Sequence, residues 1–324
     1  MEKSEKINTI LVTGNAGFIG SHLNKALLDK SYRVIGVDNF NDYYNPKFKE
    51  ENVKELANNE NFKQYRVDIV NIEKLEKVFQ DSEIDLIVHL AARAGVRPSL
   101  ENPQLYERVN VQGTKNLLQM TEKFKINRFI FGSSSSVYGI QKKIPFSEND
   151  VLQKPVSPYA ETKLKGEKLC QKYAEKYGIN MTILRFFTVY GPKGRPDMAP
   201  YLFTKALMKD KTIIKFGDGS SSRDYTYVDD IVAGIIQAIE KPFKFEIFNL
   251  GNNNPVSLND FIALVEKLTD KKAKIEIKDR HPADVPKTYA DISKAKKLLN
   301  WQPETDLETG MKKFVEWYIN QRKT

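Results

Sequence analysis

Tyr159 and Lys163 are the residues of this chain whose types and spacing most directly offer catalysis. Side chains four residues apart project from one face of a helix, so a lysine ammonium can lie beside a tyrosine phenol. A cation at that distance favours the ionised phenol, which can remove a proton from a substrate hydroxyl. Ser157 and Pro158 precede the pair and predict a helix start. Tyrosine and lysine also fall four apart by chance on exposed helices, so the pair alone leaves a noncatalytic surface helix open.

A glycine-rich turn near the start of the chain predicts a bound dinucleotide. Gly14, Gly17 and Gly20 follow a short apolar strand and open a helix with apolar residues at helical spacing. The first glycine permits a tight turn, the second lets backbone approach a pyrophosphate, and the third lets helix and strand pack closely. The pyrophosphate then lies at the unpaired N–H groups of the helix N-terminus, and a glycine turn without a ligand is the alternative. The expected contacts are Gly14, Asn15, Ala16, Gly17, Phe18, Ile19 and Gly20.

An acid after the second predicted strand favours NAD over NADP. Asp38 follows apolar residues 34–37, at about the distance expected of the acid that binds an adenosine ribose. Its carboxylate binds the ribose hydroxyls and repels a 2′-phosphate. Asp68 ends the third strand, where it either meets the adenine or caps the next helix, and Asn110 places either a kink or a water. Further cofactor contacts are expected at Asn39, Asp68, Ile69, Leu90, Ala91, Ala92 and Asn110, whereas we expect His89 to be structural.

Strands that alternate with helices must position these groups. We expect strands at residues 10–12, 34–37, 62–67, 85–90, 128–131 and 181–186, and helices at 72–79, 103–124 and 157–177. This alternation predicts an α/β fold, a Rossmann-like doubly wound parallel sheet with helices on both faces. Turn-rich stretches after residue 187 predict a smaller, interleaved C-terminal substrate lobe. The expected NAD-binding domain is residues 1–187 with a segment near 227–250 returning to it, and the substrate lobe is 188–226 and 251–324.

Composition restricts the class of protein. The chain has 324 residues, 40% of them hydrophobic, and its 51 basic and 42 acidic residues give a net charge of +9. The charges are interspersed along predicted helices, which is typical of solvated faces and not of a nucleic-acid-binding stripe. A single cysteine excludes an intrachain disulfide, and three scattered histidines lack metal-ligand spacing. A charged N-terminus and the lack of a membrane-length apolar run predict a soluble, cytoplasmic protein with no metal, nucleic-acid or membrane partner.

The glycine spacing and the Tyr159–Lys163 pair together resemble the short-chain dehydrogenase/reductase superfamily. Ser134 lies twenty-five residues before Tyr159, a spacing that resembles that of the Ser or Thr bonded to the reacting sugar hydroxyl in the extended subgroup, the nucleotide-sugar epimerases and dehydratases. The resemblance covers essentially the whole chain, including residues 223–230 and 284–291. It implies that Ser134, Tyr159 and Lys163 are catalytic and that NAD stays tightly bound, although four consecutive serines can also be a polar turn.

Two of these serines distinguish reactions within the subgroup. Relatives that dehydrate or decarboxylate the sugar tend to carry Glu at the position of Ser136, and dehydratases carry Asp at the position of Ser135. Neither residue has a carboxyl group here, so acid–base chemistry at C5 or C6 of the sugar has no obvious agent. The resemblance therefore favours an epimerase, which is an isomerase.

Residues 185–198 look closely like the corresponding stretch of UDP-glucuronate 4-epimerases, whereas glucose-type epimerases typically have Asn at the position of Thr188. By that resemblance Thr188 and Arg195 hold the C6 carboxylate of the sugar, because a guanidinium matches a carboxylate in bidentate fashion. The alternative is that Arg195 is a structural loop residue paired with Asp197. Lys193 departs from the Trp that is usual in that family.

A set of polar residues is expected to bind a UDP-sugar. Arg223 resembles the arginine that binds the pyrophosphate, and Arg280, beside His281, can substitute for a second such arginine. The full set is Arg93, Ser134, Ser135, Ser136, Tyr159, Thr188, Arg195, Arg223, Arg280 and Asp284. The sequence thus favours an NAD-dependent UDP-sugar 4-epimerase that interconverts UDP-glucuronate and UDP-galacturonate through a 4-keto intermediate, as a homodimer by family resemblance. A UDP-glucose/UDP-galactose-type 4-epimerase, a UDP-glucuronate decarboxylase and a cofactor-binding regulatory protein remain alternatives.

Overall fold

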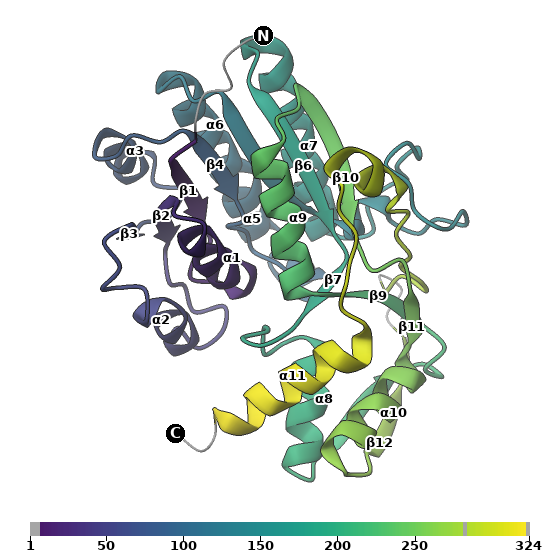
Figure 1. Cartoon of the computed structure of the whole chain (residues 1–324). Helices are drawn as coiled ribbons and strands as arrows, with labels where there is room; N and C mark the ends of the chain where they lie inside the picture. The colour runs from purple at the N-terminus through teal and green to yellow at the C-terminus, as the bar shows by residue number, and fades with distance from the viewer. Residues whose placement is uncertain (1–6, 281–283, 322–324) are drawn as a thin grey trace. The chain divides into compact units, whose positions relative to one another are not determined.

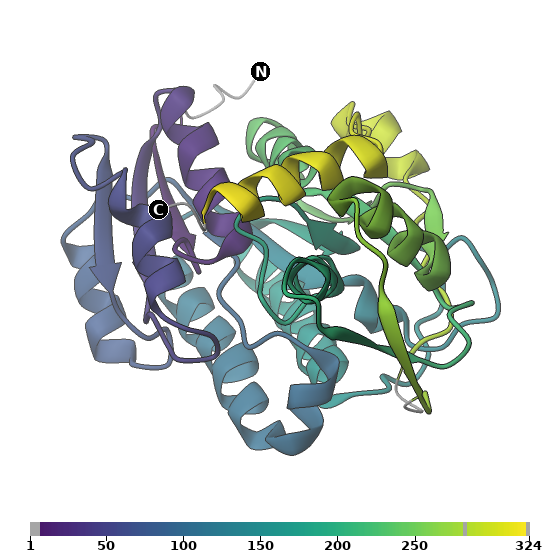
Figure 2. The same ribbon diagram turned by 90° about the horizontal axis from the view of Figure 1, so that it is seen from below.

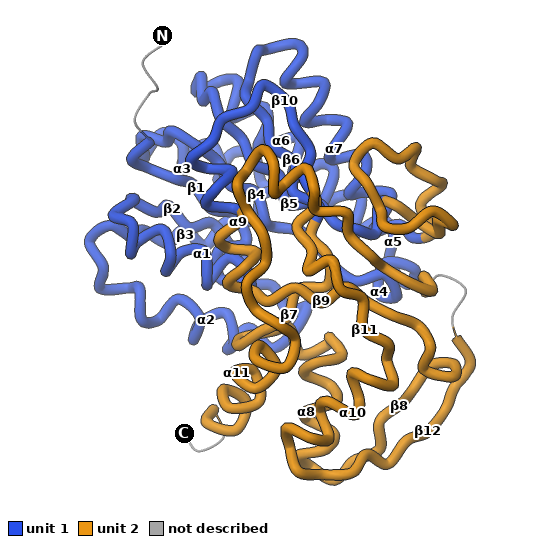
Figure 3. Tube along the Cα trace, turned by 45° about the vertical axis from the view of Figure 1, so that its right-hand side comes forward, with its two compact units in different colours: residues 1–137, 157–185, 235–248 blue, residues 138–156, 186–234, 249–324 orange. Residues whose placement is uncertain are grey.

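The computed structural model describes residues 7–280 and 284–321, and the chain divides into two compact units (Figure 3). The first unit is Met1–Val137, Ser157–Arg185 and Ile235–Phe248, and the second is Tyr138–Val156, Phe186–Gly234 and Asn249–Thr324. The segment that returns to the first unit therefore begins at Ile235, and residues 138–156, which the expected domains placed in the first, lie in the second. His281 and the charged residues 1–6 lie outside the described residues.

A seven-stranded sheet forms the centre of the first unit, in the order β10-β6-β5-β4-β1-β2-β3 (Figure 1). Its strands are β1 (Thr9–Thr13), β2 (Arg33–Asp38), β3 (Phe62–Arg66), β4 (Leu86–His89), β5 (Arg128–Ser134), β6 (Asn180–Phe186) and β10 (Phe245–Leu250). β1 pairs in parallel with β2 and β4, β2 with β3, and β4 with β5. The predicted doubly wound sheet is confirmed. The strand order reverses between β1 and β4, and the crevice outside the carboxyl ends of such strands is where ligands bind.

Helices lie on both faces of this sheet (Figures 1 and 2). α1 (Phe18–Asp29) covers one face, and α3 (Ile72–Gln80), α6 (Gly113–Lys123) and α7 (Pro158–Tyr177) cover the other. Alternate residues of a strand point to opposite faces, so one set of strand side chains packs with the second group of helices. That buried cluster includes Leu11, Ile35, Ile87, Phe129, Leu75, Leu117 and Cys170. Burying each large aliphatic side chain contributes about 1.5–3 kcal/mol to the stability of the fold. This packing holds in place the strand ends that carry the site.

The helix predicted over residues 103–124 is interrupted, which corrects the expectation of one continuous element. α5 (Pro103–Tyr106) leads into a π-helical turn, Glu107–Gln112, before α6 begins. Asn110 lies in that turn, and its side-chain amide makes two hydrogen bonds to the backbone of Arg93. Arg93 N donates to Asn110 Oδ1 at 2.7 Å, and Asn110 Nδ2 donates to Arg93 O at 3.0 Å. Asn110 Nδ2 also donates to Thr162 Oγ1 at 3.0 Å. The expected kink is present, and single π-turns of this kind are frequent at functional sites.

The helix predicted at residues 157–177, which carries Tyr159 and Lys163, is confirmed as α7, with Ser157 as its cap. Two shorter helices, α2 (Lys47–Lys54) and α4 (Val96–Glu101), follow β2 and β4.

Among the described residues no helix has both the length and the apolar content needed to cross a membrane.

The second unit combines a three-stranded sheet with a separate parallel pair of strands. β7 (Thr188–Tyr190) pairs in parallel with β9 (Ser222–Tyr227), and β11 (Pro255–Ser257) pairs antiparallel with β9. β8 (Thr212–Phe216) pairs in parallel with β12 (Lys274–Lys278). Its helices are α8 (Ala199–Met208), α10 (Leu258–Thr269) and α11 (Leu307–Asn320), and α9 (Val228–Glu240) continues from it into the first unit. Tyr225 on β9 stacks on Phe261 of α10 with ring centroids 4.6 Å apart, which ties this sheet to its helices.

Candidate active site

The glycine turn connects β1 to α1, and two of its glycines have no room for a side chain. Gly14 has a φ of +69°, and a Cβ there would lie 2.8 Å from the backbone nitrogen of Ala91. A Cβ on Gly20 would lie 2.3 Å from the carbonyl oxygen of Gly14. Gly17 caps α1 without a side-chain hydrogen bond, so the first N–H groups of the helix are available to an anion. The turn therefore fits a dinucleotide pyrophosphate, as the sequence predicts.

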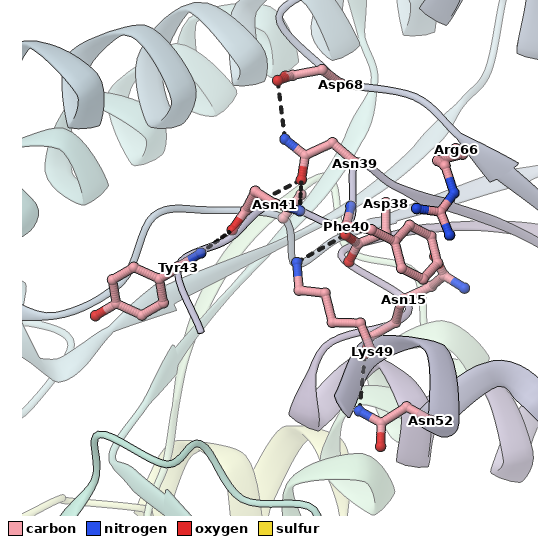
Figure 4. A network of polar contacts seen from close by, with 12 residues as sticks. Asn15, Asp38, Asn39, Phe40, Asn41, Tyr43, Lys49, Asn52, Arg66 and Asp68 are labelled. Carbon is pink, nitrogen blue, oxygen red and sulfur yellow. Dashed lines mark hydrogen bonds and ion pairs between the residues drawn. The ribbon is translucent and has the colours of Figure 1, made fainter. Parts of the chain in front are cut away.

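Asp38 ends β2, and it lies with the next residue, Asn39, in a polar network (Figure 4). Lys49 Nζ donates to Asp38 Oδ1 at 2.9 Å, and the backbone N–H of Phe40 donates to the same oxygen at 2.8 Å. Asn39 Nδ2 donates to Asp68 Oδ2 at 3.0 Å, so these two predicted cofactor contacts lie side by side. The carboxylate that is expected to bind the ribose is thus held in place by a buried ammonium.

Lys49 is a site residue that the sequence did not reveal. It lies on α2 among other charged residues, and a lysine in such a run is usually a solvated surface residue. Arg66 on β3 is a second one: it lies opposite Asp38 in the strand register, and its guanidinium lies 4.0 Å from the ring centroid of Phe40. Arg66 also forms an ion pair with Glu50. No sequence pattern signals either residue, because both positions follow from how α2 and β3 pack beside β2.

The ends of β3 and β4 bring the remaining cofactor candidates to the same unit. The backbone N–H of Ala91 donates to Thr13 Oγ1 at 3.2 Å, which places the segment Leu90–Ala92 against the glycine turn. Asn116 Nδ2 donates to the carbonyl of Ile69 at 2.9 Å and fixes the end of β3 to α6. The cap of α3 is Asn71, whose side chain accepts from Lys74 N, so the alternative that Asp68 caps this helix is wrong.

The acid–base candidates lie on β5 and α7. Lys163 is buried, and its Nζ donates to the carbonyl oxygen of Gly132 at 2.6 Å. Ser134 ends β5 two residues later, and its hydroxyl donates to Ser136 Oγ at 3.1 Å. Tyr159 lies one helical turn before Lys163 on α7. Ser135 and Ser136 begin a short 3-10 helix, so hydroxyl groups and not carboxyl groups follow Ser134.

Burial dominates the electrostatics of this group. It lowers the pKa of Lys163 to about 8, while the negative charge of Glu167 acts in the opposite direction. The ammonium stays mostly charged at neutral pH, where it can stabilise an ionised phenol on the same helix face. Lys163 therefore supplies a fixed cation next to the end of β5.

His89 ends β4 between two threonines, and its tautomer follows from their bonds. Thr114 Oγ1 donates its proton to the carbonyl of Asn110 at 2.5 Å, so it accepts from His89 Nε2 at 3.0 Å. His89 Nδ1 then accepts from Thr13 Oγ1 at 2.7 Å. Burial and the nearby Lys163 ammonium lower the pKa of His89 to about 3, so its ring is neutral, which agrees with the expected structural role.

Arg93 lies beside the loop that follows β2 in the first unit. Its guanidinium lies 5.7 Å from the ring centroid of Tyr43, and Nη2 is 3.9 Å from the carboxylate of Asp42. The side chain of Asn110 holds the backbone of Arg93, as described above. This predicted substrate residue therefore has a fixed main chain, and its acidic neighbour Asp42 is exposed.

The remaining substrate candidates gather in the second unit. Thr188 on β7 lies opposite Tyr225 in the register with β9, two residues after Arg223. Burial lowers the pKa of the Arg223 guanidinium, the charge of Asp284 opposes this, and the charge of Arg280 adds to it. Arg280 Nη2 is buried with no hydrogen-bond partner among the described residues. Two arginines, one with an unused donor, are suited to a diphosphate.

Arg195 makes a two-point ion pair in the loop after β7. Its Nε donates to Asp197 Oδ1 at 3.0 Å and its Nη2 donates to Asp197 Oδ2 at 2.5 Å. The guanidinium thus already binds one carboxylate in the bidentate geometry proposed for a substrate carboxylate. This is the pairing that the structural alternative for Arg195 requires. Lys193, two residues earlier, adopts a φ of +62°, a conformation that costs a non-glycine residue about 1–2 kcal/mol.

The structure thus gathers the predicted residues in two sets, each within one unit. The first holds the glycine turn, the strand-end residues and the acid–base group, and the second holds Thr188, Arg195, Arg223, Arg280 and Asp284. In the described ranges no group of three or more His, Cys, Asp or Glu side chains could hold a metal ion.

Comparison with known proteins shows which family the chain resembles. A family model described as GDP-mannose 4,6 dehydratase matches residues 11–314. The UDP-glucuronate 4-epimerase of Thermodesulfobacterium geofontis is 48% identical over 308 residues, which is 95% of each chain. A crystal structure of UDP-glucuronic acid 4-epimerase from Bacillus cereus in complex with UDP-glucuronic acid and NAD is 40% identical with a TM-score of 0.92, over 97% of this chain and 99% of that one. UDP-glucose 4-epimerase from Thermotoga maritima with UDP-glucose is 33% identical with a TM-score of 0.90, over 97% and 99% of the two chains.

Proposed function

The chain belongs to the nucleotide-sugar epimerase and dehydratase family that the GDP-mannose 4,6 dehydratase model describes, and we propose from this premise that it is an NAD-dependent UDP-glucuronate 4-epimerase. It interconverts UDP-glucuronate and UDP-galacturonate through a 4-keto sugar. Its relatives of that name, 40–48% identical over nearly the whole chain, support this substrate. The observation that carries the choice of reaction is that β5 ends in hydroxyl groups, with Ser134 to Ser136 in place of the carboxylates that dehydration requires.

The residues of the first unit fit the cofactor and the acid–base step. The turn from Gly14 to Gly20 holds the pyrophosphate of NAD, and Asp38 binds the adenosine ribose. When bound, NAD accepts a hydride from C4 of the sugar and returns it, so no redox equivalent is consumed overall. Lys163 stabilises the phenolate form of Tyr159, which takes the proton from the C4 hydroxyl and thereby becomes a neutral phenol.

Ser134 shares the hydrogen bond of the reacting hydroxyl, and its place at the end of β5 supports this role. The 4-keto sugar must present its other face before reduction, because epimerisation inverts the configuration at C4. The protein therefore has to hold the nucleotide firmly and the sugar loosely enough to turn.

Two groups of the second unit are proposed to recognise the substrate. Arg223 and Arg280 bind the diphosphate, and the buried unpartnered donor of Arg280 supports this assignment. Thr188 and Arg195 bind the C6 carboxylate, which distinguishes a uronate from a neutral hexose. Asp284, whose charge acts on Arg223, completes the set.

A neutral UDP-hexose epimerase is the second candidate, and one observation favours it. Arg195 is paired with Asp197, so a uronate carboxylate would have to replace or share an existing ion pair. A decarboxylase has less support, because Ser135 and Ser136 provide no carboxyl group.

We also propose that the enzyme works in the cytoplasm and as a homodimer, without nucleic-acid or membrane partners. The single cysteine and the interspersed charges support the first and last of these proposals. The dimer rests on the family resemblance alone.

One incubation separates these functions. Purified protein is mixed with UDP-glucuronate without added NAD, and the products are resolved by anion-exchange chromatography and proton NMR. We expect UDP-galacturonate. A UDP-pentose with release of carbon dioxide would identify a decarboxylase, and turnover of UDP-galactose alone would identify the neutral-hexose enzyme.

A further inference from the structure

A buried carboxylate, Glu167, joins the catalytic helix to two strands of the first unit. Glu167 lies on α7 one turn after Lys163, and the two residues are 4% and 5% exposed. Ser133 Oγ on β5 donates to Glu167 Oε1 at 2.5 Å. Arg185 on β6 donates from Nε to the same oxygen at 3.0 Å and from Nη2 to Oε2 at 2.7 Å. Three hydrogen bonds from two strands thus fix one carboxylate inside the unit.

The same part of β5 also holds Lys163. Lys163 Nζ donates to the carbonyl of Gly132, the residue before Ser133. Successive turns of α7 therefore bind successive residues of β5, and Ser134 is the next residue of that strand. A buried ammonium bonded to a neutral carbonyl is stable only with a nearby counter-charge.

The strands packed against Lys163 supply no such counter-charge among the described residues that face it. β4 contributes His89, whose ring is neutral because burial lowers its pKa to about 3. β5 contributes the Gly132 carbonyl and the ring of Phe131, whose centroid lies 5.0 Å from Nζ. These groups attract a cation only weakly, and none of them is an anion.

The candidate counter-charge lies on α7 itself, on Glu167. Tyr159 and Cys170 are the other titratable groups on this face, and burial raises the pKa of the Cys170 thiol, which is therefore uncharged at neutral pH. Burial also lowers the pKa of Lys163, and the carboxylate of Glu167 is the leading charge that opposes this loss. Glu167 is in turn bonded to Arg185, so two readings of this carboxylate are possible: a structural partner of the arginine, or a counter-charge for the lysine.

We propose that Glu167 is the positioning residue of the acid–base pair: its carboxylate keeps the Lys163 ammonium charged and holds α7 against the end of β5. The inference rests on the proposed function, in which a charged Lys163 supports Tyr159. Without this carboxylate Lys163 loses its proton at lower pH, and the phenolate loses its stabilising cation over the alkaline part of the working range. If the carboxylate serves only Arg185, the ionisation of Lys163 is independent of it.

The direct test measures the ionisation of Lys163 and needs no turnover. Protein labelled with carbon-13 at lysine Cε is titrated by NMR, and the Lys163 signal is assigned with Lys163→Arg. In Glu167→Gln we expect the Lys163 midpoint to fall by about one pH unit or more, the usual effect of losing an adjacent opposite charge. Glu161→Gln is the matched control, because it removes a carboxylate from the same helix at a side chain that is 57% exposed; its Lys163 midpoint should equal that of the wild type.

A second variant covers the case in which Glu167→Gln leaves Arg185 unpaired and the protein does not fold. Glu167→Gln/Arg185→Gln removes both charges and leaves no orphan cation. If the proposal is right, the titration midpoint of Lys163 falls in this double variant as well. If the Glu167 carboxylate serves only Arg185, the midpoint stays at its wild-type value. An unchanged midpoint in the folded variant, or an equal fall in Glu161→Gln, overturns the proposal.

The enzymatic arm follows kcat for UDP-glucuronate against pH. We expect the alkaline limb of the double variant to move to lower pH by the same interval as the Lys163 midpoint, with KM little changed. A limb that stays in place while the midpoint falls overturns the link from Glu167 to catalysis. If the wild type does not turn over UDP-glucuronate, the proposed function fails, and the NMR titration still decides whether Glu167 keeps Lys163 charged.

Discussion

Lys49 Nζ lies 2.9 Å from the carboxylate of Asp38, and only 8% and 4% of the two side chains are exposed. The acid that should distinguish NAD from NADP is therefore one half of a buried ion pair. Removing one partner of such a pair leaves an uncompensated charge, which costs several kcal/mol. We therefore expect cofactor choice at this position to depend on both residues and not on the acid alone.

The first prediction concerns the cofactor. Wild-type protein should release NAD on denaturation, and Asp38→Ala should retain less of it, because the ribose loses its acceptor and Lys49 its partner. The same variant should gain affinity for NADP, since an unpaired ammonium attracts a 2′-phosphate. Chromatography of the released nucleotide measures the first effect, and fluorescence titration with NADPH measures the second.

The control for the cofactor prediction is Asp38→Ala/Lys49→Met. This double variant should not show the increased affinity for NADP, and it should still bind NAD weakly. Release of mainly NADP by the wild type would contradict the assigned role of Asp38.

The second prediction concerns the base. Tyr159→Phe should keep its fold and its bound NAD but lose turnover by ~10²-fold or more, the usual contribution of general acid–base catalysis. Lys163→Ala should move the acid limb of the activity to higher pH, because the cation that eases ionisation of the phenol is gone. Steady-state rates against pH give both results. Near-wild-type turnover in Tyr159→Phe would exclude this role for the phenol.

The third prediction concerns His89 and stability. Its pKa is about 3 in the folded chain against the ordinary value of 6.5, so below about pH 6.5 the unfolded chain binds the proton first. The contribution of the neutral His89 ring to the free energy of unfolding is complete above that pH, and it is lost as the pH falls toward 3. At about pH 5 the loss is about 2 kcal/mol, at about 1.4 kcal/mol per unit.

Urea unfolding at about pH 7.5 and about pH 5 measures this loss. Between the two pH values the free energy of unfolding of His89→Asn should fall by about 2 kcal/mol less than that of the wild type. An equal loss in both proteins would show that other groups account for the acid sensitivity.

The parallel sheet and the cofactor turn were predictable because local patterns determine them. Apolar runs, helical spacing and the glycines at 14, 17 and 20 each act through neighbours in sequence, and the structure has the expected doubly wound sheet. The sequence left open whether Asn110 places a kink or a water. It could not decide between them, because the break in the helix over residues 103–124 involves Asn110 bonding the backbone of Arg93, seventeen residues earlier.

The supporting residues of the site were missed for the same physical reason. Lys49 and Glu167 look like ordinary surface charges in a helix, and only tertiary packing buries them against Asp38 and Ser133. A sequence shows that a carboxylate exists but not which strand end it meets. Tyr159 and Lys163, by contrast, share a helix face because of the period of a single helix.

The fourth prediction concerns Arg195 and tests the substrate. Oxidising glucuronate at C4 creates a β-keto acid, which loses carbon dioxide when its carboxylate bond aligns perpendicular to the plane of the new carbonyl. An epimerase must hold the carboxylate out of that alignment, and a bidentate guanidinium with the Thr188 hydroxyl can do so. In the structure the same guanidinium binds Asp197 at two points. The two roles of Arg195 predict different results for its two variants.

If Arg195 binds the substrate, Arg195→Ala should raise KM for UDP-glucuronate by about one to two decades, the equivalent of ~1.5–3 kcal/mol for a charge-assisted bond. Some UDP-pentose should appear as a decarboxylated side product. Asp197→Ala should not raise KM, because it removes a competitor of the substrate carboxylate, and UDP-galactose should be a poor substrate that neither change affects. If Arg195 is structural, both variants lower the thermal midpoint alike and KM for the uronate stays at its wild-type value. That outcome, or a wild type that prefers UDP-galactose, would replace the uronate assignment with the neutral-hexose enzyme.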